Sequence, residues 1–202
     1  VIILGDQIAL DATGIDVSGA RAGGTILIGG GPYGMGTFQR AQTLTVDSQT
    51  SLRADGKTVG SAGSIVLWSD IETKFFGAIS ARGGSERGDG GFAEVSSAGR
   101  LTYGGMADLR ASRGRTGDLL LDPYNITISA APDGGMAGFT ANADSSNINT
   151  TTLENALPPA NVTFSTEIGC THAADISLTS PLTSSANTRI TLPPNVEART
   201  QQ

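Results

Sequence analysis

Short apolar runs, each led by a glycine, recur along the chain at Gly24–Ile28, Gly63–Leu67, Gly91–Val95 and Gly117–Leu121. Their leading glycines lie 39, 28 and 26 residues apart. A second series of strand-like steps falls between them, with spacings of 37, 27 and 27, at Ile15, Leu52, Ile79 and Met106. Because the two series keep the same period, the chain is predicted to consist of repeated units of about 27 residues.

Parity predicts which residues of each run point inward, since alternate residues of a strand face opposite sides. One parity is wholly apolar: Ile26/Ile28, Ile65/Leu67, Ala93/Val95 and Leu119/Leu121. The other parity is mixed: Thr25/Leu27, Ser64/Val66, Phe92/Glu94 and Asp118/Leu120. We therefore expect the first set to form the interior, with Ile26, Ile65, Ala93 and Leu119 in one stack.

A unit of this size with two or three short strands cannot bury its apolar face alone and must stack on its neighbours. A helical solenoid is excluded because the chain lacks apolar spacings of three and four over a helical length. A β-propeller blade would need about 40 to 50 residues. The pattern therefore predicts an all-β fold, a parallel β-helix, which we expect to be right-handed.

The chain is predicted to have two parts that divide near residue 129. Residues 1–129 form regular coils with a loop insertion at residues 29–42, which explains the longer first spacing. Five glycines and a proline keep the insertion from being a core strand, whereas Tyr33, Met35 and Phe38 give it groups to bury. It either lies over the shaft or is a mobile loop with incidental aromatic residues.

Residues 130–202 are predicted to continue the β-helix less regularly. The capping-box spacing at Thr151–Glu154 predicts a short helical turn before Pro158 and Pro159. Strands are then expected at Val162–Phe164, Ile176–Leu178 and Arg189–Leu192.

Composition supports short strands, tight turns and small side chains, because the chain holds 28 glycines with 5% aromatic and 16% charged residues. The net charge is −6 and the Lys and Arg residues are scattered singly, which argues against nucleic acid as a partner. No apolar run approaches the roughly 20 residues of a membrane span, and Val1–Leu4 is too short for a signal peptide core. Without an initiator Met, the chain is expected to be a piece of a longer polypeptide.

Several motifs in order resemble the shaft region of the filamentous haemagglutinin family: Val66–Asp70, Phe76–Gly84, Gly90–Ser96 and Gly114–Pro123, followed by Asn125–Ile128. The resemblance covers about residues 23–128, and residues 149–192 more loosely. The ending Pro193–Glu197 departs from the usual continuation of the repeats, and the Asn-rich motifs of the family's secretion domain are not found.

The resemblance implies a non-enzymatic structural and adhesive shaft that is secreted to the bacterial cell surface and associated with the outer membrane. Such proteins use two-partner secretion, so an outer-membrane transporter would be a partner during export of the full-length protein. The other implied partner is a receptor or glycan on a host or neighbouring cell. Two alternatives stay open: a carbohydrate- or haem-binding module, and a polysaccharide-degrading enzyme built on a β-helix.

No catalytic, cofactor-binding or metal-binding residue is predicted. Cys170 and His172 are the only cysteine and histidine, whereas a metal site needs about four ligands and a nucleophilic cysteine needs an oriented base. The outward positions hold two carboxylates, Glu94 and Asp122, which could approach each other only across one coil. They lack a neighbouring base, which favours a structural use.

Other patterns have simpler explanations than a binding site. Residues 83–91 are similar to a single calcium-binding nonapeptide and include Arg87-Gly88-Asp89, but a corner turn between coils explains both. Three N-glycosylation patterns begin at Asn125, Asn149 and Asn161, and strand composition generates such patterns freely.

Two surface features remain. A ligand-binding module would need exposed aromatic side chains, for which Trp68 and Tyr103 are the candidates. Leu27, Val66 and Leu120 form an outward apolar column, which predicts that another segment or a second chain packs against it. We expect the insertion to cover this column, and packing of a second chain is the alternative.

Overall fold

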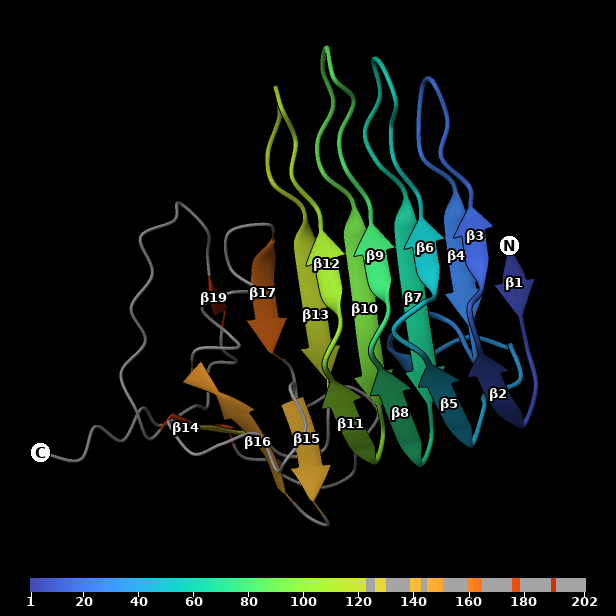
Figure 1. The fold of residues 1–202 in the computed structure, drawn as a ribbon, viewed down its shortest axis with the longest axis vertical. Helices are drawn as coiled ribbons and strands as arrows, with labels where there is room; N and C mark the ends of the chain where they lie inside the picture. Colours follow the sequence, from blue (N-terminus) through green and yellow to red (C-terminus); the bar gives the residue numbers. More distant parts are fainter. Residues whose placement is uncertain are drawn as a thin grey trace, which may run out of the picture.

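The computed structural model describes residues 1–122, 126–129, 139–142, 145–150, 160–164, 176–178 and 190–191. In this part of the chain the strands form three sheets, and nearly all neighbouring strands run parallel. Each of the regular coils contributes one strand to each sheet, so that successive coils stack side by side (Figure 1). The predicted all-β fold is confirmed, and the arrangement fits a parallel β-helix.

Sheet A holds the glycine-led runs. Its strands, in spatial order, are β1 (Ile2–Ile3), β4 (Thr25–Ile28), β7 (Ser64–Ser69), β10 (Phe92–Ser97), β13 (Asp118–Asp122), β17 (Asn161–Phe164) and β19 (Ile190–Thr191). Register partners follow one another through Ile26, Ile65, Ala93 and Leu119, and none of these side chains is more than 1% exposed. The predicted interior stack is therefore confirmed.

Sheet C holds the second series of strands. Its strands are β3 (Gly14–Asp16), β6 (Ser51–Arg53), β9 (Ala78–Ser80) and β12 (Met106–Asp108). The interior column runs through Ile15, Leu52 and Ile79 to Ala107. Met106, the fourth member of the predicted series of strand-like steps, lies on β12 but outside this column, since it pairs with Ala78 and is 75% exposed. The small Ala107 side chain fills the interior position instead.

Sheet B was not recognised as a separate series in the sequence. Its strands, in spatial order, are β2 (Gln7–Leu10), β5 (Thr43–Val46), β8 (Glu72–Phe75), β11 (Arg100–Tyr103), β15 (Phe139–Asn142), β16 (Ser145–Asn149), β14 (Ile126–Ser129) and β18 (Ile176–Leu178). The first four are parallel, whereas β15 runs antiparallel to β11 and to β16. Inside the coils, the rings of Phe75 and Tyr103 stack with their centroids 5.5 Å apart.

The strands expected in the last part of the chain are present as β17, β18 and β19, within a residue or two of their predicted bounds. The predicted helical turn after Thr151 lies outside the described residues, as do Cys170 and His172. No helix among the residues that the structure describes is long and apolar enough to cross a membrane. The division of the chain at residue 129 stays a prediction.

The leading glycines are required by the close approach of stacked backbones. A Cβ on Gly63 would overlap the carbonyl oxygen of Gly24 one coil earlier, and a Cβ on Gly91 would overlap that of Gly63. The loops between sheet C and sheet A then stack in the same order as the strands (Figure 1). For example, the Gly84 N–H donates to the Gly60 carbonyl oxygen at 2.9 Å.

Replacing Ile65 with Asp is expected to prevent folding, because an unpaired carboxylate in the middle of the apolar column cannot be hydrated. The substitution is expected to lower the free energy of unfolding by more than roughly 4–5 kcal/mol. Thr45→Asp is the matched control, since Thr45 is exposed on β5 beside Lys74. Circular dichroism and urea unfolding should show a folded T45D protein and an unfolded I65D protein. An I65D variant as stable as T45D would refute the register.

Candidate functional site

Part of the outer face of sheet A is covered, although its residues point away from the interior of the coils; the outward residues Thr25 and Asp118, at the starts of β4 and β13, are exposed. One outward column passes in register through Leu27, Val66, Glu94 and Leu120, and none of them is more than 8% exposed. The next column passes through Trp68, Ser96 and Asp122, which are at most 5% exposed. Something must therefore lie on this face.

The insertion at residues 29–42 lies on Trp68. Gly29 and Gly30 leave β4 with φ values of 77° and 159°, and a short 3-10 turn follows at Pro32–Gly34. Gly30 packs against the Trp68 side chain, and a Cβ on Gly34 would overlap the indole ring. The loop thus folds back onto the outer face of sheet A and covers Trp68, whereas its cover of Leu27, Val66 and Leu120 stays a prediction.

The groups that make this cover differ from those expected. Met35 and Phe38 are 59% and 39% exposed, so the prediction that they bury the column is wrong. Glycine backbone lies flat on the indole instead, where a larger side chain would not fit. The Tyr33 ring is half-buried, with its centroid 6.4 Å from that of Phe92.

Two polar contacts hold the loop in place. Tyr33 has a left-handed backbone, with φ 58°, and its N–H donates to both carboxylate oxygens of Glu94 at 2.9 and 3.1 Å. At the other end of the loop, the Arg40 guanidinium lies 3.0 Å from Asp70. Asp70 also accepts a hydrogen bond from the Trp68 indole N–H at 3.2 Å. The cover is therefore fastened on both sides of the indole.

Glu94 and Asp122 form a buried acidic pair across neighbouring coils. Burial raises the pKa of Glu94 to about 7, against the opposing effect of the Tyr33 N–H. Burial, together with the charge of Glu94, raises the pKa of Asp122 to about 8. Near neutral pH the pair therefore retains a proton.

The surroundings of the pair are incompletely hydrogen-bonded. Asp122 Oδ2 is buried without a hydrogen-bond partner among the described residues. The Ser96 hydroxyl lies close enough to lower the pKa of Glu94, but its Oγ meets the geometry of a hydrogen bond with none of the described residues. Buried polar atoms without a hydrogen bond are uncommon and lower the stability of the folded protein. A negative charge on either carboxyl group of this face would therefore lower its stability further.

A carboxyl group that is still protonated at neutral pH can act as a general acid. Here, however, both carboxyl groups lie at most 5% exposed beneath the face, and the Tyr33 backbone occupies the approach to Glu94. In the described part of the chain, no group of three or more His, Cys, Asp or Glu residues is arranged to hold a metal ion. The structure links the pair to the loop through the hydrogen bonds that the Tyr33 N–H donates to Glu94.

The aromatic candidates do not form an open ligand site. Trp68 is 3% exposed under the loop, and Tyr103 is 2% exposed inside the coils against Phe75. Neither candidate therefore provides the exposed ring that a ligand-binding module would need. Both were singled out because the sequence shows which rings lie on strands, but not what covers them.

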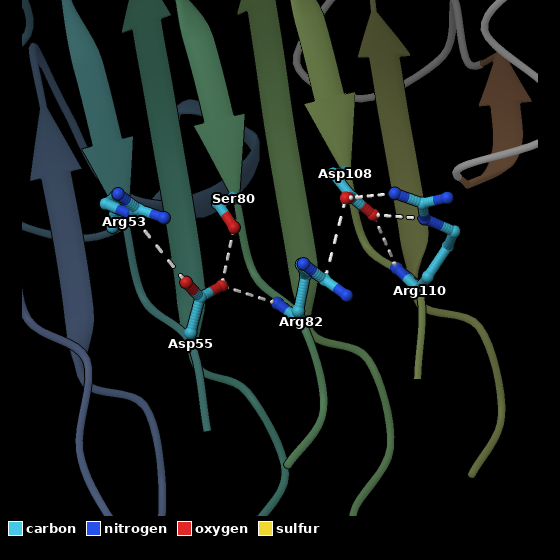
Figure 2. A network of polar contacts seen from close by, with 6 residues as sticks. All are labelled: Arg53, Asp55, Ser80, Arg82, Asp108 and Arg110. Carbon is cyan, nitrogen blue, oxygen red and sulfur yellow. Dashed lines mark hydrogen bonds and ion pairs between the residues drawn. The ribbon is translucent and has the colours of Figure 1, made fainter. Parts of the chain in front are cut away.

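Charged side chains at the carboxyl ends of the strands of sheet C bridge successive coils (Figure 2). Asp55 accepts a hydrogen bond from the Ser80 hydroxyl at 2.6 Å and from the Arg82 N–H at 2.8 Å. Its other oxygen lies 3.7 Å from the Arg53 guanidinium. A single carboxylate thus joins two neighbouring coils.

The same pattern continues one coil further (Figure 2). Asp108 receives two hydrogen bonds from the Arg110 guanidinium at 2.8 and 2.7 Å, and Arg82 lies 3.6 Å away. Although burial alone would raise the pKa of Asp108, the hydrogen bonds from Arg110 and the charges of Arg110 and Arg82 lower it. The arginine side chains are at least 50% exposed, so each pair stabilises the coils only slightly.

The Arg87-Gly88-Asp89 tripeptide lies in the loop between β9 and β10, as the corner-turn interpretation expected. Asp89 accepts the Arg115 backbone N–H at 2.9 Å and pairs with its guanidinium at 2.8 Å. A cavity of about 620 Å³ adjoins this pair and is lined also by Asp118 and Asn161. The Asp89 carboxylate is therefore already engaged by the next coil.

Gly34→Ala is expected to lift the loop, because the new methyl group would overlap the Trp68 indole. Gly36→Ala is the matched control: it also has a positive φ, 97°, but its Cβ meets only Phe38, at 4.0 Å. G34A should lose about 1–2 kcal/mol more than G36A and shift the Trp68 emission to the red. Equal stabilities and unchanged emission in both variants would show that the loop does not rest on Trp68.

The acidic pair predicts lower stability at alkaline pH. Between the ordinary pKa of Glu94, 4.5, and its folded-state pKa of about 7, the folded protein holds a proton that the unfolded chain has lost. Stability therefore falls as pH rises through this window, by on the order of 3 kcal/mol for Glu94, with a further loss from Asp122 up to about pH 8.

Urea unfolding at pH 5 and pH 9 measures this effect. Glu94→Gln should flatten the pH dependence, because a neutral amide can still accept the Tyr33 N–H. Glu72→Gln is the control, since Glu72 is ion-paired with Lys74 and Arg100 on the outside of sheet B. A wild-type free energy of unfolding that is constant or rises from pH 5 to pH 9 would contradict the burial of the pair.

Comparison with known proteins does not assign this chain to a family. No protein-family model matches the chain, and no curated protein matches it significantly. The function is therefore inferred from the arrangement of the coils and of the face that the loop covers.

Proposed function

We propose that this chain is a segment of the right-handed β-helical shaft of a secreted bacterial surface protein, similar to the filamentous haemagglutinins. The shaft is structural and carries no catalytic site or cofactor. It presents a receptor- or glycan-binding region away from the cell, and the full-length protein reaches the surface through an outer-membrane transporter.

The continuity of the stack is the observation that supports a shaft. Sheet A pairs in register from β1 to β19, and its interior column stays apolar through Ile26, Ile65, Ala93, Leu119 and Val162. Each added coil extends such a stack by about 4.8 Å, so length follows from repetition. Right-handedness is supported by the strong general preference of parallel-strand crossovers for that hand.

The partly covered outer face also supports a structural role. The outward column of sheet A is buried, and charged side chains on sheet C pair within a coil, as in Arg53–Asp55, and between coils, as in Arg82–Asp108. Packing of a second chain along the shaft is part of the proposal, because Ile71 and Met106 are 50% and 75% exposed.

An enzyme that degrades polysaccharides is the second candidate, and the acidic pair of Glu94 and Asp122 favours it. A sugar would have to displace the loop before it reached either carboxyl group. Release of reducing ends from acidic or neutral polysaccharides by the purified chain, lost in E94Q, would favour the enzyme over the shaft. A binding module for carbohydrate or haem has less support, because Trp68 and Tyr103 are both buried.

Deletion of one whole coil tests the shaft directly. Removing residues 64–91 joins Gly63 to Phe92, the register partner of Ser64, so the coils on either side can stack again. In the polypeptide that carries this chain, displayed on the source bacterium, attachment to target cells should be retained. Removing residues 64–77 is the control, since half a coil breaks the register.

Antibodies raised against the chain should label intact cells that carry the wild-type protein or the 64–91 deletion. Labelling only after permeabilisation would contradict surface exposure. Loss of attachment by a folded, displayed 64–91 deletion would place the binding site in this coil and overturn the role of a spacer.

A further inference from the structure

We propose that the loop at residues 29–42 is a proton-controlled cover, which stays closed over Trp68 while Glu94 and Asp122 share at least one proton and opens when both ionise. This device does not depend on the proposed shaft function. It rests on the position of the loop, on the hydrogen bond that fastens it and on the second carboxyl group beneath it.

The loop is built to move as a unit. It is connected to β4 through Gly29 and Gly30, whose φ values of 77° and 159° belong to glycine, and Gly36 has a φ of 97° within it. Its inner surface is glycine backbone against an indole ring, and its outer residues Met35 and Phe38 are exposed. Lifting the centre of the loop therefore breaks the hydrogen bonds of Tyr33 to Glu94 and the ring contact of Tyr33 with Phe92, while the Arg40–Asp70 pair holds the end of the loop.

Glu94 is the group that fastens the centre of the loop. Both of its carboxylate oxygens accept the Tyr33 N–H, and the Glu94 side chain is fully buried. Opening the loop would expose this carboxyl group to water. The closed loop thus keeps water away from Glu94, the same group that holds the loop in place.

Asp122 supplies the repulsion that opens the cover. It lies on β13, next to β10, and the charge of Glu94 disfavours its ionisation. The other described groups around Glu94 cannot neutralise a second charge: β7 presents Val66 and Trp68, and Arg40 of the loop is already paired with Asp70. Two carboxylates in this position lack a counter-charge among the described residues.

The direction of the pH effect follows from hydration. Opening removes the Tyr33 N–H from Glu94 and lets water reach that carboxyl group, which then ionises near its ordinary pKa, whereas the closed state holds its proton up to about pH 7. A hydrated Glu94 carboxylate repels Asp122 less than a buried one does, so ionisation of Asp122 also favours the open state. Opening therefore releases protons, and its equilibrium constant rises by up to about tenfold per pH unit below pH 7 and less steeply up to about pH 8.

Trp68 is the single tryptophan of the chain, so its fluorescence reports the cover without a label. We expect its emission to shift to the red and acrylamide quenching to increase several-fold between pH 5 and pH 9, while the far-ultraviolet circular dichroism stays unchanged. The Glu94→Gln/Asp122→Asn double variant should remain closed at pH 9. Glu72→Gln, an outward substitution on sheet B, should behave as the wild type.

Three results would overturn the proposal: unchanged wild-type emission and quenching over this range, the same transition in the double variant, or loss of the circular dichroism signal together with the shift. Hydrogen exchange of the wild type provides a second measurement if the double variant does not fold. The exchange rate of the Tyr33 amide should rise with pH more steeply than hydroxide catalysis alone predicts, because the loop also opens. The exchange rate of the Val66 amide should rise only as hydroxide catalysis predicts. Equal pH dependences for both amides would show that the loop does not open.

Discussion

In-register hydrogen bonding between successive coils is the constraint on which this structure depends. The strands are three to six residues long over most of the regular coils, and a coil alone satisfies few of its own backbone groups. Stacking supplies the partners in all three sheets at once, and it places equivalent residues directly above one another. The apolar columns, the glycine positions and the ion pairs on sheet C all follow from that superposition.

Superposition also explains how an acidic pair comes to be buried. Glu94 and Asp122 occupy outward positions, where a charged side chain would normally be hydrated. Because β10 and β13 are register neighbours, the two side chains lie on adjacent coils, and the loop from an earlier coil lies over the same face. Burial on this face raises the pKa values of both carboxyl groups, and the charge of Glu94 raises that of Asp122 further.

Repetition made the interior of sheet A predictable, because the glycine before each run and the apolar parity of residues such as Ile65 and Ala93 are properties of single strands. In sheet C the interior position of the fourth strand belongs to Ala107, which stands out less in an apolar pattern than its exposed neighbour Met106. Sheet B was not separated because its interior includes Thr73, whose hydroxyl donates to the Ser96 carbonyl oxygen at 2.8 Å. A polar residue that is satisfied inside a coil is not visible in an apolar pattern.

The candidate site was predictable only in part. The insertion and the outward apolar column were both evident in the sequence. The loop, however, contacts Glu94 through the Tyr33 backbone N–H and Trp68 through glycines, and backbone contacts of this kind leave no pattern in the side-chain sequence. The partnership of Glu94 with Asp122 depended on knowing that residues 28 apart in one coil and 26 apart in the next keep the same register.

A distance between the first and last well-paired coils tests the central claim of continuous parallel stacking most directly. Thr25 and Asn161 occupy the same register position on β4 and β17, separated by four strand spacings, or about 19 Å. Spin labels at these two positions, in a Cys170→Ser background, should give a narrow distance distribution near this value in pulsed electron paramagnetic resonance. A broad distribution, or a mean distance beyond about twice this value, would contradict the stacked β-helix.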